Sequence, residues 1–215
     1  MIVLSDNDVI IKLAQCNLIP CIGNIFGYDI NDIFVSPSAK FQILKKKDKA
    51  LRMCGSEVIV QRVGEFLESV KIIPVVEDYS LVETLQTIPK IDEGEQLLLA
   101  ACMENPGSIF MTGDKKCLSA VKENHEKLPG FHARLIDSVV TFESAILLSV
   151  QAYGFEVIYK QLCEHPKATE DNLMRAALSS DKYDGVCGCF FSFTRSHYDY
   201  LAFKDRLPAR DWLLT

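Results

Sequence analysis

Three acidic side chains stand at predicted junctions between structural elements. Asp6 follows the apolar run 2–4, and Asp114 follows the strand-like run 108–112. Glu95 opens a helical run. In an open α/β sheet, residues that follow parallel strands meet at one edge, where ligands bind. Carboxylates about 4 Å apart repel by roughly 4 kcal/mol per pair at an effective dielectric near 20. Such a cluster predicts a bound cation, and ligands that are all oxygen favour Mg²⁺ or Mn²⁺.

The chemistry that fits this pattern best is metal-dependent hydrolysis of a phosphodiester. Each acid also has a structural explanation. Asp6 and Asp114 can cap the helices that follow them, and a helix dipole favours Glu95 near the helix N-terminus. The two explanations are compatible, because an acid at a strand–helix junction can both cap a helix and bind a metal ion.

The elements that position these acids alternate along the first two-thirds of the chain. Strands are predicted at 2–4, 33–35, 71–76, 108–112 and 133–136, with helices between them at about 8–14, 38–44, 56–70, 94–104 and 114–124. Strands separated by helices pair in parallel through right-handed crossovers. Pro74 places 71–76 at the edge of the sheet or in a connection. Asp137 follows the last predicted strand and is expected to approach the same edge as the other acids.

From about residue 141 the pattern becomes purely helical. Helices are predicted at 142–153, 156–163, 170–178 and 186–203, with no strand between them. We therefore divide the chain into an α/β domain over residues 1–140 and an α-helical extension over 141–215. The extension is rich in aromatic side chains, which are typical of interfaces and equally of the core of a small helical cap. They are Tyr183, Phe190, Phe191, Phe193, Tyr198, Tyr200, Phe203 and Trp212.

Composition limits the class of protein. The chain has 215 residues, enough for one sizeable core with an appendage. The net charge of −6 argues against a broadly basic nucleic-acid surface, although 45–52 is a local cationic run that otherwise reads as a solvated helix end. No apolar run approaches the ~18 residues that span a bilayer. The start of the chain lacks a basic signal-peptide region. We expect a cytoplasmic protein without a membrane partner, whose eight cysteines are mostly reduced.

Three motifs in order resemble those of PIN-domain nucleases. Residues 4–11 (LSDNDVII) are similar to the opening strand and first acid of that family. Residues 92–101 (DEGEQLLLAA) resemble a Gly-Glu helix start that occurs in one branch of it. Residues 110–114 (FMTGD) are similar to a strand ending in Thr-x-Asp. The resemblance covers roughly residues 1–137. It implies a Rossmann-like, three-layer sheet whose clustered acids bind Mg²⁺ or Mn²⁺ and hydrolyse RNA.

Carried over residue by residue, the resemblance gives the catalytic and metal-ligating roles to Asp6, Glu95 and Asp114. It implies that Thr112 orients Asp114 through its hydroxyl group. It also implies that Lys115 or Lys116 contacts the nucleic-acid backbone. Many members of the family are toxins of toxin–antitoxin modules. The expected partners are thus an RNA substrate and an antitoxin-like protein. Association with a second copy of the chain is left as an open alternative.

The sequence departs from the family at one position. Gln42 stands about where the family carries a further acid, and a neutral amide binds a cation weakly. Asp8 is an acid that could compensate. The departure leaves open a second reading, a PIN-like binding module with weakened catalysis that acts through its helical tail. A third reading is a haloacid dehalogenase-like phosphatase, because residues 6–8 have its Asp-x-Asp form. Two features argue against this phosphatase. Val9 stands where that family has a small residue, and Glu95 would have no role in it.

Overall fold

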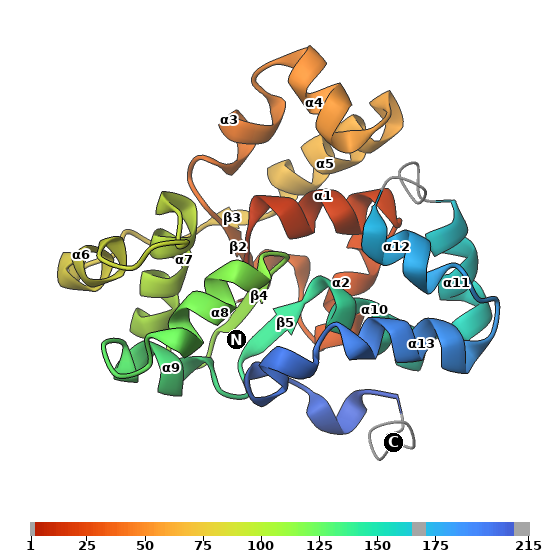
Figure 1. Cartoon of the computed structure of the whole chain (residues 1–215). Helices are drawn as coiled ribbons and strands as arrows, with labels where there is room; N and C mark the ends of the chain where they lie inside the picture. Colours follow the sequence, from red (N-terminus) through yellow and green to blue (C-terminus); the bar gives the residue numbers. More distant parts are fainter. Residues whose placement is uncertain (1–2, 165–170, 209–215) are drawn as a thin grey trace.

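The protein is a mostly helical α/β chain with one small parallel sheet. Figure 1 shows the computed structural model, which describes residues 3–164 and 171–208. The five strands have two to four residues each: β1 (Val3–Ser5), β2 (Ile33–Val35), β3 (Lys71–Ile72), β4 (Ile109–Thr112) and β5 (Val139–Thr141). The predicted α/β class is confirmed. The finer assignment to a three-layer, PIN-type sheet stays a prediction.

Helices surround the sheet. The α-helices of the described residues are α1 (Asn7–Gln15), α2 (Ile22–Phe26), α3 (Ala39–Leu44), α4 (Lys47–Cys54), α5 (Glu57–Ser69), α6 (Tyr79–Gln86), α7 (Glu93–Glu104), α8 (Lys115–Glu123), α9 (Pro129–Leu135), α10 (Phe142–Tyr153), α11 (Phe155–Cys163), α12 (Asn172–Ala177) and α13 (Tyr183–Ser192). Short 3₁₀ turns occupy Ile19–Cys21, Ile30–Asp32, Arg195–Tyr200 and Lys204–Arg206.

The strand predicted at 133–136 is wrong. These residues belong to the end of α9 and the turn after it, and the fifth strand begins three residues later, at Val139. Pro129 favours the helix, because proline at a first helical position lacks only an N–H that has no partner there. Arg134 holds the helix in place by donating to the backbone carbonyls of Cys102 and Ser108. A run of four residues is too short to separate the period of a strand from that of a helix.

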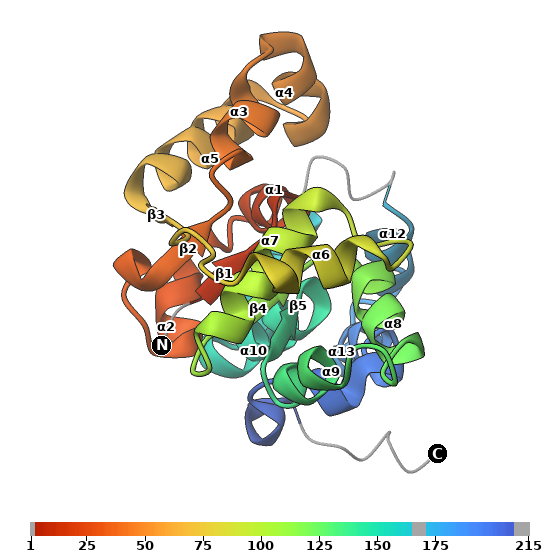
Figure 2. The same ribbon diagram turned by 90° about the vertical axis from the view of Figure 1, so that its left-hand side faces the viewer.

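The sheet is buried on both faces except at β3, whose two residues are exposed. Its order is β3-β2-β1-β4-β5, and all neighbouring strands are parallel. Along β4, Ile109 and Met111 join a core with α1 and α10, whereas Phe110 joins a second core with α7 and α8. Figure 2 shows α6 and α7 crossing in front of the strands. Burial on both faces is the usual state of parallel sheets. β3 is an edge strand, as Pro74 predicted.

The C-terminal helices pack onto the same core as the sheet. Residues of α10 and α13 share one apolar cluster with α1 and α5. The backbone N–H of Ala202 donates to the carbonyl of Val139 in β5 at 2.8 Å. Phe190, Phe191 and Tyr200 are buried, so much of the aromatic content of the extension is core. The predicted boundary near residue 140 marks a change in element pattern, and packing continues across it. Trp212 and the predicted helix start at Glu170 lie outside the described residues.

Helices α3 and α4 form an arm that projects from the body of the molecule, as both views show (Figures 1 and 2). Ala39 and Ile43 of α3 are buried and anchor the arm to the core that contains α5. Gly55 ends α4 in a left-handed conformation with φ of 92°, which glycine adopts without strain. Helix α4 contains most of the cationic run predicted at 45–52, so this run belongs to the arm.

In the part of the chain that the structure describes, no single helix is long and apolar enough to cross a membrane. Residues 7–15 and 19–26 meet the length and composition criteria only as a pair, which is bent by 104°.

Candidate functional site

The three predicted acids line one pocket at the carboxyl ends of β1 and β4. From β1 the chain continues to β2 on one side of the sheet, and from β4 to β5 on the other. A crevice opens where neighbouring strands diverge in this way. The pocket has a volume of about 440 Å³. It is lined by Asp6, Asn7, Asp8, Ser36, Gln42, Asp92, Glu93, Gly94, Glu95, Leu98 and Asp114. The structure thus brings together Asp6, Glu95 and Asp114, and adds Asp8 and Gln42 as predicted.

Asp6 ties β1 to β4 and also caps α1. Its Oδ1 accepts the backbone N–H of Val9 at 2.9 Å. Its Oδ2 accepts the backbone N–H of Gly113 at 2.9 Å and the hydroxyl of Thr112. The resemblance implied that Thr112 orients Asp114 through its hydroxyl group, and this contact is present, although it reaches the backbone of Asp114 and not its carboxylate. Thr112 orients Asp6, and toward Asp114 its hydroxyl accepts only the backbone N–H, at 3.0 Å.

Glu95 and Asp114 are helix-capping residues as well. Glu95 forms a capping box with Asp92, in which the Glu95 carboxylate accepts the backbone N–H of Asp92 at 3.0 Å and the reverse bond measures 2.8 Å. Asp114 accepts the backbone N–H of Lys116 at 2.6 Å and so caps α8. The N-termini of α1, α7 and α8 therefore face one pocket, and their dipoles favour its negative charge. The structural explanation of each acid holds alongside their convergence.

For Glu95 and Asp6, burial and the repulsion between carboxylates raise the pKa by more than the hydrogen bonds lower it. Glu95 is only 6% exposed. Burial, then the nearby Asp92, Asp114 and Asp6, raise the pKa of Glu95 to about 7, although its bond from the Asp92 backbone acts in the other direction. Burial also raises the pKa of Asp6, against its three hydrogen bonds. The raised pKa values of Glu95 and Asp6 show that the hydrogen-bond donors of the pocket do not fully stabilise these carboxylates in their charged form, which is the condition that favours a bound cation.

We expect Glu95→Gln to stabilise the protein at pH 8 and to change it little at pH 5. The ordinary pKa of 4.5 is raised to about 7 in the folded state, so folding is favoured by the protonated form. This contribution is complete below the unfolded pKa and is lost as the pH rises through about 7. The difference at pH 8 should be roughly 1–3 kcal/mol. Gln keeps an oxygen for the capping box.

Urea unfolding in EDTA at the two pH values measures this difference. Glu93→Gln is the matched control, because Glu93 is exposed on the same helical turn. A stability difference between wild type and Glu95→Gln that is the same at both pH values would contradict the expectation.

Asn7 is a pocket residue that the sequence analysis did not single out. Its side-chain N–H donates to Oε1 of Gln42, which joins the first helix to the arm. Its Oδ1 is buried and has no hydrogen-bond partner among the described residues. A buried oxygen without a partner loses the hydration it has in the unfolded chain. Its place directly after Asp6 was the only signal in the sequence. Ser36 and Glu93 were missed too.

Asp8 is a partly neutralised member of the pocket. Its carboxylate forms an ion pair with Lys12 one turn later at 2.9 Å. Gly113 leaves room for it, because a Cβ on Gly113 would lie 2.6 Å from Oδ2 of Asp8. Asp8 therefore adds charge at the rim of the pocket, with a lysine that already offsets part of it.

The possible ligand atoms in the pocket are of the type that a hard divalent cation prefers. All of them are oxygens, several are acidic, and one buried oxygen lacks a partner. The described residues nevertheless contain no group of three or more His, Cys, Asp or Glu side chains that are placed to hold a metal ion together. Mg²⁺ is commonly held by one or two carboxylates while it keeps several waters. The arrangement matches that looser mode better than a closed cage.

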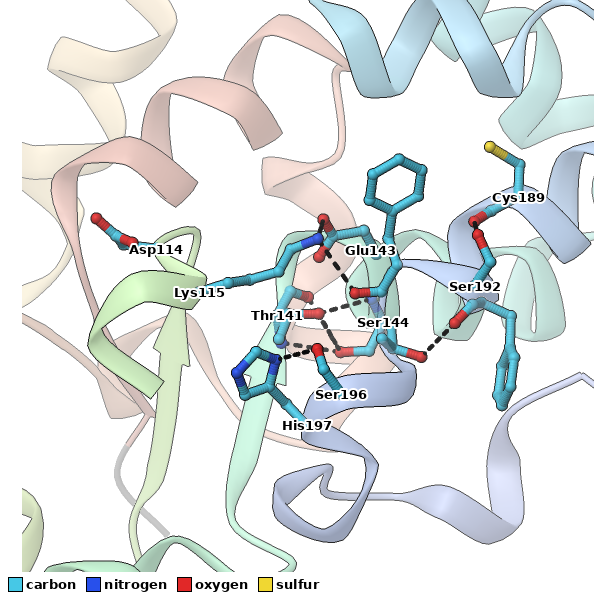
Figure 3. A network of polar contacts seen from close by, with 12 residues as sticks. Asp114, Lys115, Thr141, Glu143, Ser144, Cys189, Ser192, Ser196 and His197 are labelled. Carbon is cyan, nitrogen blue, oxygen red and sulfur yellow. Dashed lines mark hydrogen bonds and ion pairs between the residues drawn. The ribbon is translucent and has the colours of Figure 1, made fainter. Parts of the chain in front are cut away.

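The two lysines after Asp114 differ in their surroundings. Figure 3 shows Lys115 reaching away from Asp114 toward α10. Its ammonium lies 2.6 Å from Oε1 of the buried Glu143 and donates to the carbonyl of Phe193 at 3.1 Å. Lys116 is exposed. Lys115 thus has a structural partner, and the predicted contact of either lysine with nucleic acid stays a prediction.

Asp137 does not belong to the site. It precedes β5, so it lies at the opposite end of that strand from the pocket, and it pairs with Lys204. The expectation that it approaches the other acids followed from the misplaced fifth strand and is corrected with it.

Comparisons with known proteins add no assignment. No family model matches the chain, and no curated protein and no solved structure matches it significantly.

Proposed function

We propose that this chain is an Mg²⁺- or Mn²⁺-dependent endoribonuclease of the PIN-like type. The observation that carries the proposal is one pocket lined by Asp6, Glu95 and Asp114, which come from three distant segments. The strand order supports the Rossmann-like part, because β3-β2-β1-β4-β5 reproduces the first five positions of the doubly wound order. Helices and apolar cores on both faces of the sheet support three layers.

Each residue has a distinct role in this proposal. Glu95 and Asp114 would hold the ion, together with Asp6, whose orientation is fixed by Thr112 and Gly113. The ion would supply charge stabilisation at the scissile phosphate and activation of the attacking water. The carboxyl group of Glu95 is partly protonated near neutral pH, since burial and the neighbouring carboxylates raise its pKa to about 7. Cation binding must displace that proton, so the affinity for the ion should rise from pH 6 to pH 8.

Hydrolysis of a labelled single-stranded RNA by the EDTA-treated protein tests the proposal. We expect fragments only after Mg²⁺ or Mn²⁺ is added, and a rise in Tm with either ion. Absence of fragments together with an unchanged Tm would exclude the proposed site. A rise in Tm without hydrolysis would favour the second candidate, a PIN-like binding module. That candidate draws on Gln42 and on the lack, within residues 3–164 and 171–208, of three acidic, His or Cys side chains placed to hold a metal ion together.

We expect Gln42→Glu to tighten metal binding, because it adds a carboxylate to the pocket. The new side chain can still accept the N–H of Asn7. The Kd for Mn²⁺ should fall by about three- to tenfold, as one further charge at the pocket is worth on the order of 1 kcal/mol. Gln86→Glu, on the exposed face of α6, adds the same charge outside the pocket and should leave the Kd unchanged. Equal effects of the two substitutions would show that only net charge matters. Calorimetric titration measures both.

A haloacid dehalogenase-like phosphatase has the weakest support. Its nucleophile would be Asp6, whose two oxygens accept three hydrogen bonds that hold the sheet and α1 together. Its acid would be Asp8, which pairs with Lys12.

A further inference from the structure

We propose that the arm, defined as α3 and α4, binds a single-stranded RNA segment, with one base stacked on Phe41 and the backbone held by the surrounding cations. This inference rests on the proposed ribonuclease, since it names how that enzyme would hold the substrate beside its pocket.

The first observation is an exposed aromatic ring beside the pocket. Phe41 is 59% exposed, whereas Ala39 and Ile43 of the same helix are buried. The next residue, Gln42, lines the pocket. The side chain of Phe41 is therefore presented to solvent on the short helix that contributes Gln42 to the pocket. An exposed ring offers a face on which any base can stack.

The second observation is the charge around that ring. The ammonium of Lys45 lies 3.9 Å from the centroid of the Phe41 ring. Residues 40–52 contain six cations and one carboxylate, although the whole chain carries a net charge of −6. Two of these cations form exposed pairs, Lys40 with Glu68 and Lys47 with Glu57. Exposed pairs are weak, so they leave the stretch attractive to phosphate.

The pocket itself repels a phosphate backbone. Six carboxylates line it: Asp6, Asp8, Asp92, Glu93, Glu95 and Asp114. A polyanion that enters this pocket needs an anchoring surface of opposite charge close by. The arm, with the six cations of residues 40–52, is a surface of that charge on the segment that supplies Gln42 to the pocket. The combination of lysines with one aromatic ring fits a nucleic-acid strand whose bases are free to stack.

Fluorescence anisotropy with a labelled, mixed-sequence RNA single strand tests the arm in EDTA, where divalent ions cannot support hydrolysis. Phe41→Leu removes the ring and keeps an apolar side chain, and it should weaken the Kd by about fivefold or more. Phe41→Tyr should restore binding. Lys45→Gln should reduce the salt dependence of log Kd by about 0.7. Tyr79→Leu is the control, because Tyr79 is a 58% exposed aromatic residue of α6, outside the arm.

Two results would overturn the inference: no binding of the RNA by the wild-type protein, or equal Kd values for wild type and Phe41→Leu. Both are independent of catalysis. Hydrolysis by the wild type with Mn²⁺, combined with an unaffected Phe41→Leu, would reject the arm and retain the nuclease. Loss of binding in Phe41→Leu without any hydrolysis by the wild type would retain the arm as an RNA-binding surface and reject the nuclease.

Discussion

Asp114→Asn will abolish metal-dependent RNA hydrolysis and leave the fold intact. The substitution removes a negative charge from the pocket, and loss of several kcal/mol of metal-linked stabilisation lowers the rate by at least about 100-fold. The role of Asp114 in the fold is to accept the backbone N–H of Lys116 at the start of α8. Asparagine caps helices about as well as aspartate, so the free energy of unfolding should change by less than about 1 kcal/mol.

Asp6→Asn should also lose activity, but unlike Asp114→Asn it should clearly lower the free energy of unfolding. Both oxygens of Asp6 accept hydrogen bonds, from Val9, Thr112 and Gly113. An amide has only one oxygen, so its NH₂ group must face at least one N–H or O–H donor. A buried donor without an acceptor costs about 1–3 kcal/mol.

Urea unfolding and RNA hydrolysis, measured on the same two variants, separate these roles. Equal stability losses for Asp6→Asn and Asp114→Asn would contradict the hydrogen-bond argument. Full hydrolysis by purified Asp114→Asn would contradict the site.

The elements of this fold were predictable where local signals agreed. The strand at 33–35 and the helix at 142–153 match the predicted bounds. Asp92 caps the helix that carries Glu95, and an aspartate just ahead of a helical run is a local signal of this kind. Apolar periodicity and cap residues act over a few positions, so the sequence displays them directly. The prediction of the fifth strand at 133–136 was wrong, because Pro129 and the long-range hydrogen bonds of Arg134 favour a helix there.

The convergence of the acids was predictable, but their detailed partners were not. Parallel strands place the residues that follow them at one edge, which brings Asp6 and Asp114 together. The bond from Thr112 to Asp6 joins residues 106 positions apart. The contact between Asn7 and Gln42 depends on how the arm packs against the first helix. Such pairings follow from tertiary packing, and no spacing in the sequence encodes them.

Lys115→Met is expected to destabilise the protein by about 3 kcal/mol, because it leaves a buried carboxylate without its closest cation. Glu143 is 4% exposed, and the ammonium of Lys115 lies 2.6 Å from its Oε1. The same ammonium is 4.7 Å from the centroid of the Phe193 ring. Methionine keeps much of the apolar stem of lysine, so the change reports the charge more than the packing. Lys12 also interacts electrostatically with Glu143 and would still offset part of its charge in the variant. The expected loss of stability is therefore near the lower end of the range for buried pairs.

A double-mutant cycle decides between the ion pair and simple packing. Glu143→Leu with Lys115→Met removes both charges and should recover much of the stability, since buried pairs are often replaceable by apolar side chains. Additive losses in the double variant would show that the two side chains act independently.

The ion pair between Lys115 and Glu143 also affects the pocket, because Lys115 is the first residue of α8 and Asp114 caps that helix. If the pair holds the start of α8 in place, Lys115→Met should weaken Mn²⁺ binding and the double variant should restore it. A charge-only role of Lys115 in contacting RNA gives the opposite pattern, with RNA affinity lost in both variants and Mn²⁺ affinity unchanged.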